Sequence, residues 1–144
     1  MVIFIDTSSL SKRYVEEDGS ASVDSYFASN NIICLAPTTP IEVRSVLSRR
    51  KKERSLSAEV VESALSEWLK EEPEFQIESF SPQLRKEAIE IVETSGIKTL
   101  DAIQLGAAKL AGAEVFVTSD KALAAAAQAS FSGAVVFIGN VSRQ

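Results

Sequence analysis

Residues 2–10 read Val-Ile-Phe-Ile-Asp-Thr-Ser-Ser-Leu, four apolar side chains followed at once by an acid and three hydroxyl residues. This pattern predicts a buried strand over 2–5 and a helix that begins just after it, because hydroxyl and acidic residues favour helix N-termini. A second apolar run, Val115-Phe116-Val117, leads in the same way to Asp120. Ligands of parallel sheets bind beyond the carboxyl ends of the strands. Two strands that each lead to an Asp therefore predict two carboxylates at one edge of a sheet.

The rest of the chain alternates short apolar runs with longer amphipathic stretches, which is typical of strands joined by crossover helices. Strands are expected at 2–5, 32–36, 75–78, 114–118 and 134–137. Helices are expected at about 7–15, 20–27, 39–54, 57–69, 82–95, 100–111 and 121–128. The predicted fold class is α/β, with a central parallel sheet of about five strands flanked by helices on both faces, in a single domain over residues 1–144. Strand order is left open by this pattern.

Composition excludes several kinds of chemistry. The 144 residues contain no histidine and one cysteine, Cys34, so nucleophilic triads and His-ligated zinc are excluded, and so is an intramolecular disulfide. Cys34 lies in an apolar run, and a small buried side chain is expected there. No apolar run is long enough for a membrane span, and the opening residues do not form a secretory signal, so the expected location is the cytoplasm, with no membrane partner.

Four acids form the predicted site: Asp6 and Asp120 after strands, and Glu42 and Asp101 at the starts of two expected helices. If both helix starts lie at the same sheet edge as the strand ends, the four carboxylates come within a few ångströms of one another. Like charges about 4 Å apart repel by about 4 kcal/mol at an effective dielectric of about 20. Such a group either takes up protons or binds a cation, and Mg²⁺, which prefers oxygen ligands, is the natural choice.

Each acid also has a purely structural explanation, because helix N-termini favour negative charge. Thr39-Pro40-Ile41-Glu42 fits a capping box, in which Glu42 bonds back to the cap. Asp101 follows the expected cap Thr99 by two residues. Asp6 and Asp120 are harder to explain in this way, since neighbouring Ser and Thr residues could cap those helices instead. Both explanations stay open at this point.

The segments around the four acids resemble the PIN domain family, and within it the VapC toxins of toxin–antitoxin pairs. The resemblance lies in four segments that occur in that family's order and spacing: Phe4-Ile5-Asp6-Thr7-Ser8, Ile41-Glu42-Val43-Arg44-Ser45-Val46-Leu47, Thr99-Leu100-Asp101-Ala102-Ile103-Gln104-Leu105 and Val117-Thr118-Ser119-Asp120-Lys121-Ala122-Leu123. It extends from Val2 to about Leu123. Gln104 and Gly106 depart from it, since related toxins often have His and Ala there.

This resemblance implies an endoribonuclease that hydrolyses RNA with Mg²⁺ or Mn²⁺. Asp6, Asp101 and Asp120 would be metal ligands, and Glu42 would complete the set directly or through water. Thr7 and Ser119 would be polar neighbours of the ligands, with a helix-capping role as the alternative. The resemblance also implies a homodimer and a small antitoxin partner that obstructs the acidic pocket.

Basic residues are concentrated on one expected helix, although the net charge of the chain is −5. We expect phosphate contacts there, with a solvated helix end as the alternative. The residues concerned are Arg44, Arg49, Arg50, Lys51 and Lys52. Two rival functions remain: a PIN-like module that binds RNA or protein without catalysis, and a Mg²⁺-dependent phosphatase, which wants an Asp where Ser8 stands.

Overall fold

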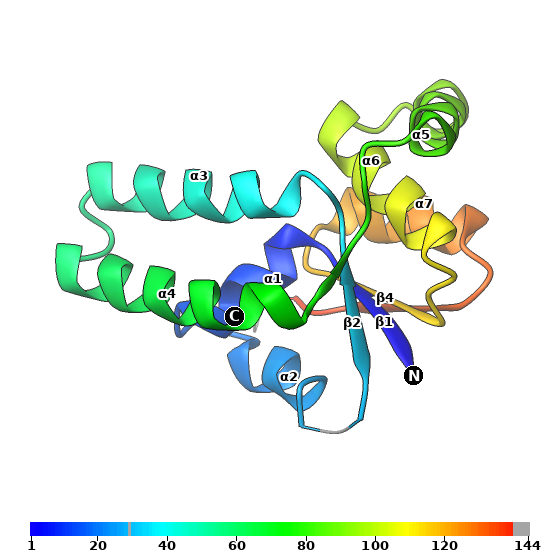
Figure 1. Ribbon diagram of the computed structural model, residues 1–144. Helices are drawn as coiled ribbons and strands as arrows, with labels where there is room; N and C mark the ends of the chain where they lie inside the picture. The colour runs from blue at the N-terminus through cyan, green and yellow to red at the C-terminus, as the bar shows by residue number, and fades with distance from the viewer. Residues whose placement is uncertain (29, 140–144) are drawn as a thin grey trace, which may run out of the picture.

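The computed structural model describes residues 1–28 and 30–139, and Figure 1 shows the arrangement. Its elements in chain order are β1 (Val2–Ile5), α1 (Thr7–Tyr14), α2 (Ser20–Ser25), β2 (Ile32–Leu35), α3 (Thr39–Lys52), α4 (Ala58–Glu71), a 3-10 turn (Glu72–Glu74), β3 (Gln76–Ile77), α5 (Pro82–Ser95), α6 (Thr99–Leu110), β4 (Val115–Thr118), α7 (Lys121–Ser130) and β5 (Ala134–Phe137). The sequence-based boundaries agree to within a few residues. The main difference is β3, which has two residues instead of four.

The sheet has the strand order β3-β2-β1-β4-β5, and every neighbouring pair is parallel. This confirms the predicted α/β class. The chain runs from β1 outward to β3 and then returns to the other side of β1 for β4 and β5, so the strand order reverses between β1 and β4. A crevice opens at such a reversal beyond the carboxyl ends of the strands. The short β3 forms one edge of the sheet, where few backbone groups are left unpaired.

Alternating side chains of the central strands divide the apolar core into two layers. Ile3 and Ile5 of β1 pack with residues of α1 to α4, whereas Phe4 packs with residues of α5 to α7. Figure 1 shows the two groups of helices on opposite sides of the strands. Phe4 stacks on Phe116 of β4 with ring centroids 5.5 Å apart. The prediction of helices on both faces is confirmed, and Cys34 is buried in the second layer as expected.

The helix caps differ from those predicted. Asp6 and Asp120 themselves cap α1 and α7, accepting hydrogen bonds from the backbone N–H groups of Ser9 and Leu123. Neighbouring hydroxyl residues could have capped these helices instead but do not, so the structural explanation holds for both acids. Each Asp directly precedes the first helical residue in extended conformation, which is the geometry an N-cap requires. These two acids therefore stabilise helix N-termini in addition to any role they have in a functional site.

The two helices that begin near Glu42 and Asp101 have no side-chain cap. Their N-cap residues are Thr38 and Lys98, one position before the predicted caps Thr39 and Thr99, which already lie inside the helices. Gly96 follows α5 and adopts the left-handed conformation, which ends that helix.

Among the helices of the described residues, none has both the length and the apolar character needed to cross a membrane.

Candidate active site

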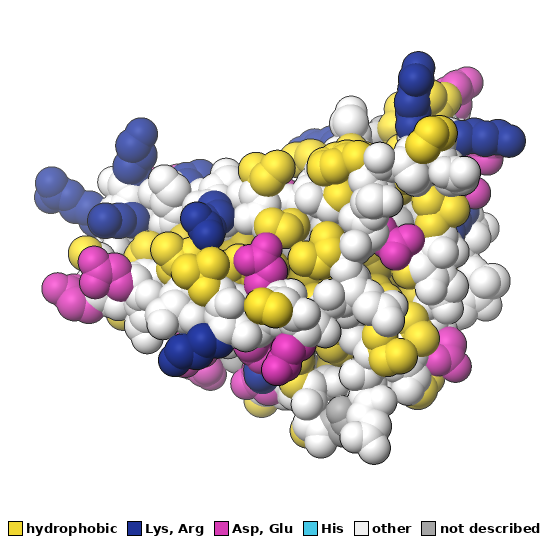
Figure 2. All heavy atoms as spheres, in the orientation of Figure 1, with side chains coloured by type: hydrophobic (Ala, Val, Ile, Leu, Met, Phe, Trp, Pro, Cys, Tyr) yellow, Lys and Arg dark blue, Asp and Glu magenta, His cyan; other side chains and the backbone are white. Residues whose placement is uncertain are grey.

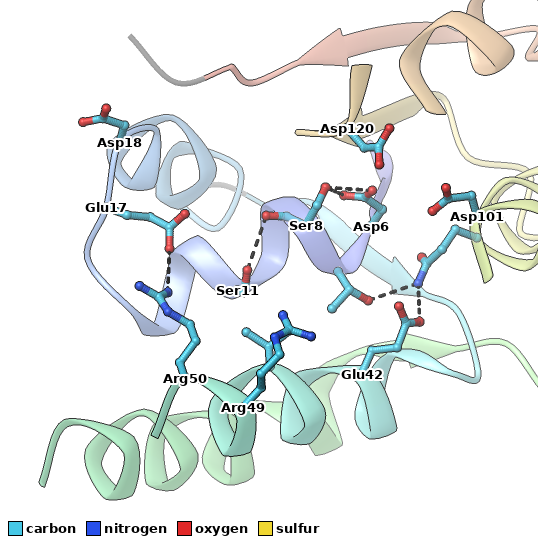
Figure 3. A pocket seen from close by; sticks show the side chains of 13 residues that line it. Asp6, Ser8, Ser11, Glu17, Asp18, Glu42, Arg49, Arg50, Asp101 and Asp120 are labelled. Atoms are coloured by element: carbon cyan, nitrogen blue, oxygen red, sulfur yellow. Dashed lines mark hydrogen bonds and ion pairs between the residues drawn. The ribbon is translucent and has the colours of Figure 1, made fainter. Parts of the chain in front are cut away.

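A cavity of about 620 Å³ opens at the carboxyl ends of β1 and β4, where the strand order reverses. All four predicted acids, Asp6, Glu42, Asp101 and Asp120, are among its lining residues. Asp6 follows β1, Asp120 follows β4, and Glu42 and Asp101 stand in the first turns of α3 and α6. Figure 3 shows the four side chains around one end of this space. The fold thus brings together groups that are up to 114 positions apart, from Asp6 to Asp120.

Asp6 is the most buried of the four, with 3% of its surface exposed. Ser8 Oγ lies 2.7 Å from Asp6 Oδ1 and Thr118 Oγ1 lies 2.7 Å from Oδ2, and both hydroxyls donate. The backbone N–H of Ser9 also donates to Oδ1. Burial nevertheless raises the pKa of Asp6 to about 6, with a smaller contribution from the negative charge of Asp101. The hydrogen bonds only partly offset the loss of solvation.

The other acids also affect one another electrostatically. Partial burial raises the pKa of Asp101, and the negative charges of Asp120 and Glu42 raise it further, although Lys98 acts in the opposite direction. Within the described residues, none of the four acids forms an ion pair with Lys or Arg. The cavity is therefore an anionic site whose charge the described part of the chain leaves uncompensated.

The acids line the cavity but do not converge as closely as the sequence suggested. In residues 1–28 and 30–139, no three of the His, Cys, Asp and Glu side chains are close enough to hold one metal ion together. Mg²⁺ does not need such a cage, since it keeps several waters and is usually bound through one or two carboxylates and substrate phosphates. The hard oxygen donors fit a hydrated cation of this kind, and burial together with the charge of neighbouring acids raises the pKa of Asp6 and of Asp101.

The two predicted polar neighbours, Thr7 and Ser119, do not contact the acids in any hydrogen bond between described residues. Thr7 Oγ1 instead accepts from Gln104 Nε2, and Ser119 bonds to Ser9 and Ser8. The hydroxyls that hold Asp6 belong to Ser8 and Thr118, which sequence reasoning missed. Thr118 could have been found only from the register, because the pairing of Ile5 with Val117 sets Thr118 beside Asp6.

Glu42 is held through one carboxylate oxygen. Thr38 Oγ1 donates to Oε1 at 2.6 Å, and Gln104 Nε2 donates to the same atom at 2.8 Å. A capping box would instead have the carboxylate accept from the backbone N–H of the cap. No such bond occurs among the described residues, so this structural explanation of Glu42 is not supported.

The opposite end of the cavity holds charges of both signs, with Glu17 and Asp18 near two arginines (Figure 3). Arg49 and Arg50 of α3 are among its lining residues, while Arg44, Lys51 and Lys52 are exposed and do not line it. The helical repeat explains the difference between Arg49 and Arg44. Arg49 lies seven positions after Glu42 and shares its face of α3, whereas Arg44 lies two positions after Glu42 and does not. Arg50 pairs with Glu17 at 3.2 Å. Arg49 Nε lies 4.0 Å from Glu53 Oε1, which is long for an ion pair, and both side chains are exposed. The Arg49 guanidinium is therefore weakly held.

A comparison with known proteins gives one family and several related folds. The family model of the PIN domain matches residues 3–129. VapBC2 from Rickettsia felis, solved with a DNA fragment from its promoter, has a TM-score of 0.65 and 19% identity over 94% of this chain and 97% of that chain. No curated protein sequence matches.

Two further solved structures are similar. VapC20 from Mycobacterium tuberculosis, described as a toxin that cleaves the sarcin-ricin loop, has a TM-score of 0.67 and 17% identity over 86% of this chain and 94% of that chain. FitAcB from Neisseria gonorrhoeae has a TM-score of 0.61 and 20% identity over 93% of this chain and 96% of that chain. At these identities the likeness establishes the fold alone.

Replacing Asp6 by Asn is expected to raise the free energy of unfolding of the metal-free protein at pH 8. The pKa of the Asp6 carboxyl is about 6 in the folded protein, against an ordinary value of 3.8. The contribution of Asp6 to stability is therefore complete below pH 3.8 and is lost as the pH rises to about 6. The shift corresponds to about 3 kcal/mol, which weaker hydrogen bonding by Asn will partly offset. Urea denaturation with a chelator should show that the variant's advantage grows by about 1 kcal/mol between pH 5 and pH 8.

Glu59→Gln serves as the control for this measurement, since it removes an exposed charge on α4. Its stability relative to the unsubstituted protein should change little over the same pH interval. An Asp6→Asn variant whose relative stability is equally independent of pH would contradict the assignment of a raised pKa to Asp6.

Proposed function

The chain belongs to the PIN domain family, and from this premise we propose that it is a Mg²⁺- or Mn²⁺-dependent endoribonuclease, the toxin of a VapBC-type toxin–antitoxin pair. The observation that carries the proposal is the cavity at the strand-order reversal, lined by Asp6, Glu42, Asp101 and Asp120. An intact set of four acids also favours a nuclease over a silent RNA- or protein-binding module, which has no need of uncompensated buried charge.

The proposed metal ligands are Asp6, Asp101 and Asp120, with Glu42 acting directly or through water. A bound divalent cation neutralises charge on a phosphate and makes water a better nucleophile at neutral pH. Ser8 and Thr118 hold the Asp6 carboxylate in place by hydrogen bonds. The reaction is hydrolysis, in which a water oxygen bonds to phosphorus, the bond to the leaving ribose oxygen breaks, and that oxygen takes up a proton.

RNA is the proposed substrate because the cavity has acids that can hold a cation and an arginine that can contact phosphate. Asp6, Asp101 and Asp120 would hold a cation, which would offset the negative charge of a phosphate. Further along α3, Arg49 can contact a neighbouring phosphate, since its guanidinium is exposed and only weakly engaged. VapC20, with a similar fold, is an RNA-cleaving toxin, which supports the same substrate class here.

A small antitoxin is the first proposed partner. Several similar structures are of VapBC toxin–antitoxin systems, among them VapBC2 and VapBC-1 from Haemophilus influenzae. A basic side chain of such a partner would be attracted to the cavity by the same uncompensated charge that favours a cation. Co-expression with the product of a small adjoining gene should suppress RNA cleavage. If no small gene adjoins the gene for this chain, the proposal of an antitoxin partner is weakened.

A second copy of the chain is the other proposed partner, through an apolar groove of about 820 Å³ between α5 and α6. Figure 2 shows hydrophobic side chains exposed near α5 beside charges of both signs. Arg85, Ile89 and Glu93 line this groove at successive turns of α5. A two-fold axis at Ile89 would set Arg85 of each copy beside Glu93 of the other, the self-complementary pattern of a symmetric dimer.

We expect purified protein to cleave single-stranded RNA with Mn²⁺ or Mg²⁺ and not with a chelator. Asp6→Asn, which keeps shape and removes charge, should lower the cleavage rate by at least about a hundredfold. Asp18→Asn is the matched control, since Asp18 lines the same cavity away from the four acids, and should stay within about threefold. RNA cleavage that survives both chelation and Asp6→Asn would overturn the nuclease assignment.

Arg49→Ala is expected to raise KM severalfold with little change in kcat, because a phosphate contact contributes to binding more than to chemistry. The slope of log KM against log salt concentration should decrease by about one. Arg44→Ala, on the same helix but outside the cavity, provides the control. Equal effects of the two substitutions would show that α3 acts through its overall charge and not through Arg49.

A charge exchange tests the proposed dimer. Arg85→Glu and Glu93→Arg should each weaken dimerisation, and the double variant should restore it, because the pairs re-form with opposite signs. Lys86→Glu is the control on the same helix. Sedimentation velocity gives the dimer fraction, and a monomeric unsubstituted protein, or single variants as dimeric as Lys86→Glu, would exclude this surface.

A further inference from the structure

Gln104 is a polar side chain buried at the meeting point of three helices. It lies on α6, three residues after Asp101 and so on nearly the same face, and only 2% of its surface is exposed. Its amide nitrogen Nε2 donates to Glu42 Oε1 at 2.8 Å and to Thr7 Oγ1 at 3.1 Å. A longer contact of 3.4 Å joins it to Thr39 Oγ1. One amide thus links α6 to α1 and α3.

Burial of this amide is not explained by packing. Its oxygen Oε1 is buried and has no hydrogen-bond partner among the described residues, which is unfavourable for a polar atom. A leucine or methionine would fill a similar volume and leave no oxygen unpaired. The presence of glutamine is therefore better explained by what its NH₂ group contacts.

The contacts of the NH₂ group concern the candidate active site. An ionised carboxylate only accepts hydrogen bonds, so Glu42 requires a donor at this point and fixes which end of the amide faces it. Gln104 and Thr38 both donate to Oε1 of Glu42. Glu42 lines the cavity, and among the described residues no hydrogen bond is directed to its other oxygen, Oε2.

We propose that Gln104 is a positioning residue that holds Glu42 by one oxygen so that the other can serve a cation, and that fixes α1, α3 and α6 with their acids around the cavity. This inference rests on the proposed metal-dependent function. Gln104 itself contacts neither substrate nor cation in this role. It acts through Glu42 and, by way of Thr7, on the start of the helix that Asp6 caps.

The test is the affinity of the purified protein for Mn²⁺ without RNA, measured by isothermal titration calorimetry. Gln104→Leu removes the donor and should weaken Mn²⁺ binding by about tenfold or more, the effect expected when a partner of a metal ligand is lost. Gln104→His keeps an N–H donor of similar reach and should stay within about threefold. Ser57→Ala, which removes the cap of α4 far from the cavity, should leave Mn²⁺ affinity unchanged.

A double-mutant cycle separates positioning from a general loss of structure. If Gln104 acts through Glu42, Gln104→Leu should add little to the loss of Mn²⁺ affinity already caused by Glu42→Gln. Should Gln104→Leu fail to fold, the unbranched Gln104→Met takes its place in the cycle.

One outcome is that Gln104→Leu binds Mn²⁺ as tightly as the unsubstituted protein while Asp6→Asn binds it more weakly. This result would overturn the role of Gln104 and leave the nuclease proposal standing. Fully additive effects of Gln104→Leu and Glu42→Gln would overturn it as well. Unsubstituted protein that neither binds Mn²⁺ nor cleaves RNA would instead remove the proposed function, and the inference with it.

Discussion

Asp6 brings a carboxylate into the interior of the protein at the end of the central strand, and the surrounding structure is arranged around that charge. Its oxygens accept hydrogen bonds from Ser8, Ser9 and Thr118, and it caps α1. These contacts tie β1, β4 and α1 to one group. They do not fully replace water, because burial still raises the pKa of Asp6 to about 6. The fold thus retains, at the strand-order reversal, a carboxylate whose charge is disfavoured by burial.

The four acids of the candidate site lie apart from the two arginines that line the cavity. The acids gather at the end formed by β1, β4 and the first turns of α3 and α6, while Arg49 and Arg50 lie further along α3 (Figure 3). Arg50 is engaged by Glu17, which also pairs with the buried Lys12. The arginines therefore do not neutralise the acids. The proposed phosphodiester substrate would complement this arrangement through a cation at the four acids and a phosphate at Arg49.

Much of this arrangement could be predicted from the sequence, because it depends on local patterns. Val2–Ile5 and its acid, the second apolar run before Asp120, and the helix starts near Glu42 and Asp101 gave the fold class and the four acids, and the resemblance to the PIN family is confirmed by the family match. The roles of Thr118 and Gln104 could not be predicted in this way. Both depend on contacts between segments far apart in the chain: the β1–β4 register, and the packing of α6 against α1 and α3. The prediction that the four carboxylates lie within a few ångströms of one another went too far for a related reason. Residues that line one cavity can still have side chains too far apart to hold one ion together.

The central claim is that the acids of this cavity bind a divalent cation. Crystals grown with Mn²⁺ and measured at a wavelength where manganese scatters anomalously test it most directly. The account predicts an anomalous peak inside the cavity, at about 2.0–2.2 Å from a carboxylate oxygen of Asp6, Asp101 or Asp120, the separation typical of small hard cations. A well-ordered cavity with no such peak at saturating Mn²⁺, or a peak only at other surface acids, would contradict it.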